Sequence, residues 1–149
     1  MSWSRPEAMH ITLLFLGNIR SDDLPRLENA LAAAVRAHAF FEIELSGLGS
    51  FNNRVLWAGV EKGSDELTTL ANSVRAAAKH FGNHEEERAF NAHITLGRFR
   101  GRGRGVEAGL KRIPPPRFKP WRVDHVELIR SELSPKGSRY TPLGTVHLS

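Results

Sequence analysis

The tetrapeptide His-Ile-Thr-Leu occurs twice in this chain of 149 residues, beginning once at His10 and once at His93. A chain of this composition would contain roughly 0.001 copies by chance, so the repeat calls for a physical reason. We predict a β-strand around each copy. Because alternate side chains of a strand lie on opposite faces, His10 shares a face with Thr12, and His93 shares one with Thr95. Each copy therefore presents an imidazole and a hydroxyl group together.

Two imidazoles and two hydroxyl groups in one cleft suit an in-line displacement at phosphorus. Imidazole titrates near neutral pH, so one ring can act as a base while the other is a protonated acid. One histidine would take a proton from the attacking water or hydroxyl group, and the other would protonate the departing oxygen. The hydroxyl groups of Thr12 and Thr95 would donate hydrogen bonds to the non-bridging phosphate oxygens, whose charge grows in the transition state. This chemistry requires neither a metal nor a cofactor.

Two other interpretations of the histidines are open. A histidine on a strand is often a hydrogen-bonded structural residue, although the repetition favours catalysis. A metal site built on His10 and His93 is the second alternative, but it lacks an obvious third ligand. His125 is the one further histidine in a clear strand interior, and no His-x-x-x-His pair or carboxylate cluster accompanies it. We therefore expect no metal and no cofactor.

The elements that must position these residues follow from hydrophobic periodicity and turn signals. We expect an α+β domain of about six or seven strands and two long helices, in which the strands at 41–45 and 55–60 are antiparallel. Ser21 is the expected N-cap of the first helix, which would reach about His38, and the second helix would run from Ser64 to Phe81. The expected strands are residues 9–16, 41–45, 55–60, 90–99, 121–133 and 140–148, with breaks at Gly47 and Gly49 and a turn at 134–137.

Composition places the chain among globular proteins and makes one domain, residues 1–149, the expectation. It is 40% hydrophobic and 25% charged, and the absence of cysteine excludes a thiol nucleophile and cysteine-based metal sites. No apolar run is long enough to span a membrane, and the N-terminus lacks the plan of a secretory signal, so we expect a cytoplasmic protein. A net charge of +5 favours a polyanionic partner. The Arg-Gly repeats at 100–105 are one candidate RNA contact, and the alternative that we favour is a solvated charged face.

These motifs and their flanks resemble the 2H phosphoesterase superfamily, and within it the RNA 2′,3′-cyclic phosphodiesterases, historically called 2′-5′ RNA ligases. The likeness runs over nearly the whole chain. The blocks that carry it are RPEAMHITLLFLG at 5–17, Phe51 with RVLWAGV at 54–60, AHITLGR at 92–98, and LIRSEL at 128–133 followed by Gly137 and Tyr140.

The resemblance implies a bilobal, pseudo-two-fold α+β fold with antiparallel sheets, in which each lobe supplies one His-x-Thr strand to a shared groove. It implies that His10 protonates the leaving 3′ oxygen and that His93 activates water. The activity implied is metal-independent hydrolysis of RNA 2′,3′-cyclic phosphate ends to 2′-phosphates, with 2′-5′ RNA ligation as a side activity. RNA 3′ ends or cyclic nucleotides would be the substrates.

Further residues of the family blocks are secondary candidates. Arg130 and Tyr140 match a block near the groove and would bind phosphate, and the alternative is a salt-bridged strand arginine and a packed tyrosine. Phe51 would offer a base-stacking face or, in the alternative that we favour, would pack locally. Ala92 stands where the family usually has proline.

The start of the chain departs from the family pattern, because the first motif begins almost at Met1, where family members carry roughly thirty residues of strand and helix before it, and we expect that element to be missing. Its absence would leave the uncharged strand at 9–16 as a sheet edge, and an exposed edge invites pairing. We therefore expect either a homodimer through this N-terminal edge or a longer native chain. The alternative function is a non-catalytic or weakly active RNA-end or nucleotide-binding module on the same fold.

Overall fold

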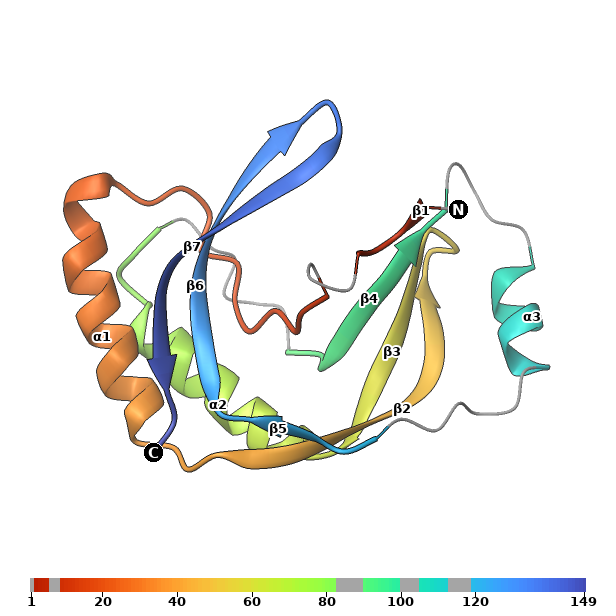
Figure 1. Ribbon diagram of the computed structural model, residues 1–149, viewed down its shortest axis with the longest axis horizontal. Helices are drawn as coiled ribbons and strands as arrows, with labels where there is room; N and C mark the ends of the chain where they lie inside the picture. Colours follow the sequence, from red (N-terminus) through yellow and green to blue (C-terminus); the bar gives the residue numbers. More distant parts are fainter. Residues whose placement is uncertain (1, 6–8, 83–89, 100–104, 113–118) are drawn as a thin grey trace. The chain divides into compact units, whose positions relative to one another are not determined.

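The computed structural model describes residues 2–5, 9–82, 90–99, 105–112 and 119–149. Within them the chain forms an α+β arrangement (Figure 1), as predicted. The elements in chain order are β1 (Ser2–Trp3), a 3-10 turn (Ser21–Asp23), α1 (Leu24–Arg36), β2 (Phe41–Phe51), β3 (Val55–Lys62), α2 (Ser64–Ala77), β4 (His93–Arg98), α3 (Val106–Lys111), β5 (Trp121–Val123), β6 (His125–Ser134) and β7 (Gly137–His147). Residues 100–104 of the predicted Arg-Gly loop lie outside the described residues.

The chain divides into two compact units. The first, unit 1, consists of Met1–Thr12, Glu42–Thr68 and Asn91–Trp121. The second, unit 2, consists of Leu13–Phe41, Thr69–Phe90 and Arg122–Ser149.

A sheet with the strand order β1-β4-β3-β2-β5 carries the second His-x-Thr motif, and its pairs β1/β4, β4/β3 and β3/β2 are antiparallel (Figure 1). One face is lined by buried side chains that lie opposite each other in neighbouring strands, such as Ala58 and Ile94. The predicted breaks at Gly47 and Gly49 are both wrong, since β2 continues through these residues. Gly47 has a φ of 71° and lies where the register of β2 and β3 shifts, so it accommodates a bulge in a continuous strand.

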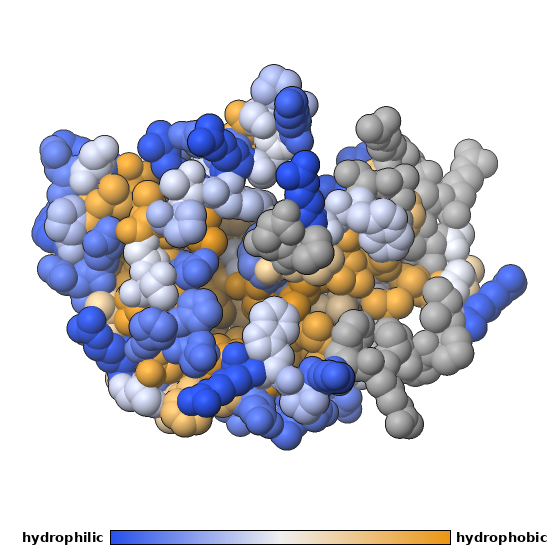
Figure 2. Space-filling model, in the orientation of Figure 1, coloured by the Kyte–Doolittle hydropathy of each residue, from blue (hydrophilic) through white to orange (hydrophobic). Residues whose placement is uncertain are grey.

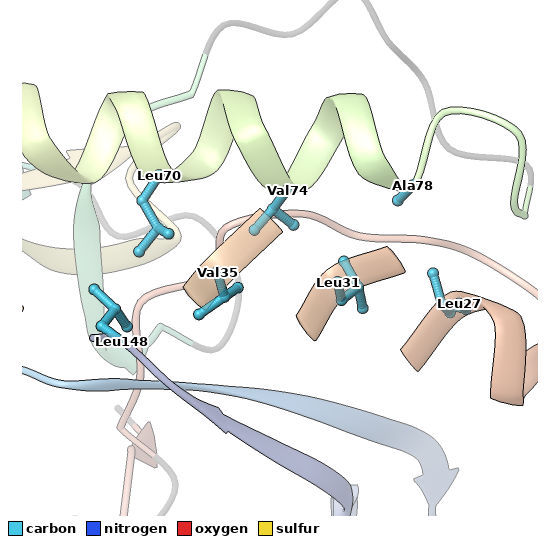
Figure 3. Close-up of a cluster of buried hydrophobic side chains, with 7 residues drawn as sticks. All are labelled: Leu27, Leu31, Val35, Leu70, Val74, Ala78 and Leu148. Atoms are coloured by element: carbon cyan, nitrogen blue, oxygen red, sulfur yellow. The ribbon is translucent and has the colours of Figure 1, made fainter. Parts of the chain in front are cut away.

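Unit 2 contains the main hydrophobic cluster, in which α1 and α2 face each other (Figure 3). The buried residues of α1 recur every four positions, which places them on one side of the helix. Both long helices were predicted, but Ser21 is not the N-cap of α1, because it lies in the 3-10 turn. The cluster consists of Leu27, Leu31, Val35, Leu70, Val74, Ala78 and Leu148.

Strands β6 and β7 form a two-stranded antiparallel hairpin, whose turn lies at the predicted residues. Gly137 has a φ of 112°, which side-chain-bearing residues rarely adopt, and the hydroxyl group of Ser134 donates a 2.6 Å hydrogen bond to the Gly137 carbonyl oxygen. The predicted start at Tyr140 was too late, because pairing begins at the turn itself.

The prediction of a strand at 9–16 is wrong, since these residues have no regular secondary structure. Leu13, Leu14 and Leu16 all pack against the cluster of unit 2. Apolar residues at both odd and even positions cannot all be buried on one face of a strand. The strand that pairs with the outer side of β4 is β1 instead. The predicted homodimer therefore loses the edge strand on which it was based.

The surface mixes hydrophilic and hydrophobic residues, as Figure 2 shows for one face of the molecule. Several large apolar side chains are exposed, including Phe15 and Leu133. In the part of the chain that the structure describes, no helix is long and apolar enough to cross a membrane.

The cluster of unit 2 gives a stability prediction. Leu70 is 1% exposed and Leu133 is 93% exposed. We expect Leu70→Ala to lower the free energy of unfolding by about 2–5 kcal/mol, because it leaves a cavity between the helices. The matched change Leu133→Ala should cost less than about 0.5 kcal/mol. Urea denaturation followed by circular dichroism measures both, and equal costs would contradict the assignment of the core.

Candidate active site

Strand β4 presents His93 and Thr95 on one face of the sheet and buries Ile94 on the other. Ile94 is 2% exposed, whereas both motif residues are half-buried. In the register of β3 and β4, Gly59 lies opposite His93 and Trp57 lies opposite Thr95. Directly opposed residues share a face, so the second motif and these two positions of β3 form one surface.

The imidazole of His93 has a defined hydrogen bond. Its Nδ1 lies 2.8 Å from the backbone carbonyl oxygen of Asn91. A carbonyl oxygen only accepts hydrogen bonds, so Nδ1 carries the proton and donates. In the neutral ring Nε2 then holds the lone pair, and this nitrogen is the one that can accept a proton.

Two aromatic side chains, Phe51 of β2 and Trp57 of β3, flank His93. The ring centroid of Phe51 lies 5.1 Å from that of His93, with an angle of 82° between the planes. The centroid of Trp57 lies 6.2 Å from that of His93 at 62°, and Phe51 and Trp57 are 5.4 Å apart. These are the edge-to-face and tilted geometries that aromatic pairs prefer. The packing role that we favoured for Phe51 agrees with these contacts, although its side chain is 37% exposed.

Glycines make room for this arrangement. A Cβ atom at Gly49 would lie only 2.6 Å from Cε2 of Trp57, and one at Gly59 would lie 3.3 Å from Cζ3 of the same ring. The indole therefore lies against the backbone of β2 and β3, where any larger residue at position 49 would displace it.

The first motif lies in the irregular segment that begins at Met9. His10 is exposed and Thr12 is half-buried. Both belong to unit 1, together with His93 and Thr95, and the border between the units falls directly after Thr12. The four predicted phosphate-handling residues are therefore members of the same compact unit.

Arg130 and Tyr140 belong to the β6–β7 hairpin in unit 2. Arg130 forms an ion pair with Glu132 at 2.7 Å, in which both side chains are about half exposed. This geometry matches the alternative of a salt-bridged strand arginine. Tyr140 lies opposite Ser131 and is 43% exposed.

A second histidine with polar partners lies at the base of the hairpin. Nδ1 of His125 is 2.7 Å from Oδ1 of Asp124. This hydrogen bond lowers the pKa of the Asp124 carboxyl, and the positive charges of Arg122 and His147 act in the same direction while desolvation opposes them. Among the described residues, no three histidine or acidic side chains are grouped so that they could hold a metal ion.

Comparison with known proteins identifies the family. Residues 3–135 match the family described as the 2′-5′ RNA ligase superfamily. The chain belongs to this superfamily, as its two motifs indicated.

Its relatives and structural neighbours agree. An RNA 2′,3′-cyclic phosphodiesterase of Archaeoglobus fulgidus is 37% identical over 142 residues, covering 93% of this chain and 78% of that protein. One of Methanothermobacter thermautotrophicus is 35% identical, covering 96% and 80%. A crystal structure of a Thermus thermophilus protein superposes with a TM-score of 0.82 at 32% identity, covering 98% of this chain and 81% of that chain. Escherichia coli LigT complexed with 3′-AMP gives 0.79 at 29%, covering 99% and 80%.

The motifs alone do not identify Trp57, Gly49 or Asn91 as parts of the site. Trp57 lies within the block RVLWAGV. The signal available in the sequence was the two-residue period of this block, which places alternate residues on one face of the strand. The acceptor role of Asn91 depends on the path of the irregular backbone before β4, which no residue pattern indicates.

The lowered pKa of the Asp124 carboxyl, at the base of the β6–β7 hairpin, gives a prediction about pH dependence. A carboxyl whose pKa is lowered by folding stabilises the fold above its ordinary value of 3.8, and this contribution is lost as the pH falls through the lowered value. We expect carbon NMR titration to place the pKa of Asp124 below 3.8. His125→Gln should raise it more than His147→Gln does. An unchanged titration of Asp124 in His125→Gln would show that the hydrogen bond is not its main cause.

Proposed function

We propose that this protein is an RNA 2′,3′-cyclic phosphodiesterase that opens the cyclic phosphate by two-histidine acid and base catalysis without a metal. The observation that carries the proposal is the state of His93. Its Nδ1 is occupied by the Asn91 carbonyl oxygen, Nε2 is left as the proton acceptor, and Thr95 lies on the same face of β4. The membership of the chain in the 2′-5′ RNA ligase superfamily supports it.

In the proposed reaction His93 is the base and His10 is the acid. Nε2 of His93 takes a proton from water while the water oxygen forms a bond to phosphorus. The bond between phosphorus and the 3′ oxygen breaks, and protonated His10 gives its proton to that oxygen. The product keeps the phosphate on the 2′ oxygen. Thr12 and Thr95 donate hydrogen bonds to the non-bridging oxygens as their charge increases.

The substrate is an RNA 3′ end or a cyclic nucleotide. The relatives that share 31–37% identity carry the name RNA 2′,3′-cyclic phosphodiesterase, and structures of Escherichia coli LigT hold 3′-AMP or phosphate. The net charge of +5 favours a polyanion of this kind. A cytoplasmic location, where RNA ends are processed, is part of the same proposal.

The proposal includes 2′-5′ ligation as a side activity, which the same displacement would allow. If an RNA 5′-hydroxyl group takes the place of water, the same displacement leaves a 2′-5′ phosphodiester, with His93 taking the hydroxyl proton. The non-catalytic binding module is not favoured, because the relatives matched over most of the chain are named as phosphodiesterases. Turnover of 2′,3′-cyclic AMP distinguishes the two functions.

The two histidines are expected to act as a unit. We predict that His10→Ala and His93→Ala each remove most of kcat with 2′,3′-cyclic AMP, and that the double variant loses little more, because either loss alone interrupts the proton transfers. Initial rates measured with EDTA present throughout provide the test. His80→Ala, which changes an exposed histidine outside the motifs, is the matched control.

Fully additive losses in the double variant would contradict a shared reaction step. Loss of the wild-type rate in EDTA with recovery on addition of zinc would instead favour the metal alternative.

The hydroxyl groups have a smaller predicted effect. Thr12→Val and Thr95→Val keep the side-chain shape and each remove one hydrogen bond to the phosphate, so we expect kcat to fall on the order of 10–1,000-fold. Thr145→Val, on an exposed site of β7, is the control. Full activity in both motif variants would show that the hydroxyl groups do not bind the reacting phosphate.

A further inference from the structure

We propose that Trp57 is a positioning residue, which holds the imidazole of His93 in the orientation that leaves Nε2 available. This inference rests on the proposed role of His93 as the base. Trp57 exchanges no proton in the reaction and acts through its contact with the imidazole of His93.

The first observation is the backbone surface against which the indole lies. Gly49 lies opposite Trp57 in the pairing of β2 and β3, and a Cβ atom there would lie 2.5 Å from Cη2 and 2.6 Å from Cε2 of the ring. Neither Gly49 nor Gly59 has a positive φ, so the backbone does not require glycine at either position. At Gly49 the space filled by the indole is what requires glycine, whereas at Gly59 the nearest neighbour of a Cβ atom would be the backbone carbonyl oxygen of Ser46, at 3.1 Å.

The second observation is that the indole extends toward His93. Gly59 is the direct cross-strand partner of His93. A Cβ atom at Gly59 would lie 3.3 Å from Cζ3 of Trp57, so the six-membered part of the indole extends over this position toward the strand of the histidine. The ring thereby fills the place beside His93 that a side chain of residue 59 would otherwise occupy.

The third observation is how the imidazole is held. The hydrogen bond from Nδ1 to the Asn91 carbonyl oxygen fixes one ring atom, but a ring held at one atom can still tilt about that bond. The contacts with Trp57 at 62° and with Phe51 at 82° restrict the tilt from two directions. An error of about 1 Å in the position of a reacting group can cost about 100-fold in rate. Restricting the tilt of the imidazole should therefore raise the reaction rate substantially.

The indole does this by its shape. Its Nε1 is buried and has no hydrogen-bond partner among the described groups. Losing the N–H group should therefore matter less than losing the ring, and phenylalanine at position 57 should retain most of the function that alanine removes.

The experiment compares Trp57→Ala, Trp57→Phe and Gly49→Ala in steady-state kinetics with 2′,3′-cyclic AMP. We expect Trp57→Ala to lower kcat about 10–100-fold with little change in KM, because the base is misplaced while the phosphate contacts remain. Gly49→Ala should lower kcat similarly, because the new methyl group displaces the indole. Trp57→Phe should retain most of kcat. The controls are Trp121→Ala, a 46% exposed tryptophan, and Gly144→Ala, where a Cβ atom meets its nearest neighbour at 4.0 Å.

A spectroscopic measurement separates positioning from a general loss of structure. Nitrogen NMR of the neutral His93 ring should show the Nδ1–H tautomer in the wild type and in Trp57→Phe, and a mixture of tautomers in Trp57→Ala. Thermal melting identifies any variant that fails to fold, in which case Trp57→Phe and Gly49→Ala carry the comparison.

The double variant tests whether the glycine acts through the indole. Gly49→Ala added to Trp57→Ala should cause no further loss of kcat, because the ring that it displaces is already absent. An unchanged kcat and tautomer in folded Trp57→Ala would overturn the proposal, as would a Gly49→Ala loss that persists without the indole. If the wild type does not open cyclic phosphates but the tautomer still responds to Trp57, the proposed function is wrong and the positioning role stands.

Discussion

Close packing of an indole ring against a glycine-bearing sheet face is the constraint on which the candidate site depends. The ring of Trp57 lies against the backbone at Gly49 and Gly59, and it reaches the neighbourhood of His93 because neither position has a side chain. Protein interiors tolerate little change in side-chain volume. The space beside Gly49 and Gly59 therefore holds the indole only while neither position has a side chain. The imidazole is in turn held by Asn91 and by two aromatic neighbours.

The opposite face of the same strands explains why this surface can be stable. Leu56, Ala58 and Ile94 are at most 7% exposed, so β3 and β4 are anchored by burial on one side. A shift of register by one residue would turn these side chains toward the site and His93 toward the buried face, which makes the wrong register costly. Burial on one face thus fixes which face carries the chemistry.

Sequence reasoning was most successful where one periodicity dominated. The alternation in β3 and β4, the helical spacing of α1 and the turn before Gly137 were all predicted close to their observed places. It failed at residues 9–16, where Leu13, Leu14 and Leu16 are partly buried against the cluster of unit 2 without a strand's alternation. It failed also at Gly47, since whether a glycine ends a strand or accommodates a bulge depends on the partner strand. The short helix α3 had no predictive signal that we recognised.

The site itself divides in the same way. The histidines and threonines were found from an improbable repeat and Phe51 from a family block, but Gly49 and Trp57 were not found, because they meet only through the register of β2 and β3. That register includes bulges whose positions depend on tertiary packing. Cross-strand contacts of this kind cannot be derived from a single sequence.

The identity of the product tests the central claim most directly, because the claim assigns the leaving atom. The measurement is phosphorus NMR of the product formed from 2′,3′-cyclic AMP in ¹⁸O-labelled water with EDTA present. Water activated by His93 and a 3′ oxygen protonated by His10 predict 2′-AMP alone, with one ¹⁸O atom on phosphorus. A 3′-phosphate product, or no turnover without added metal, would contradict the account.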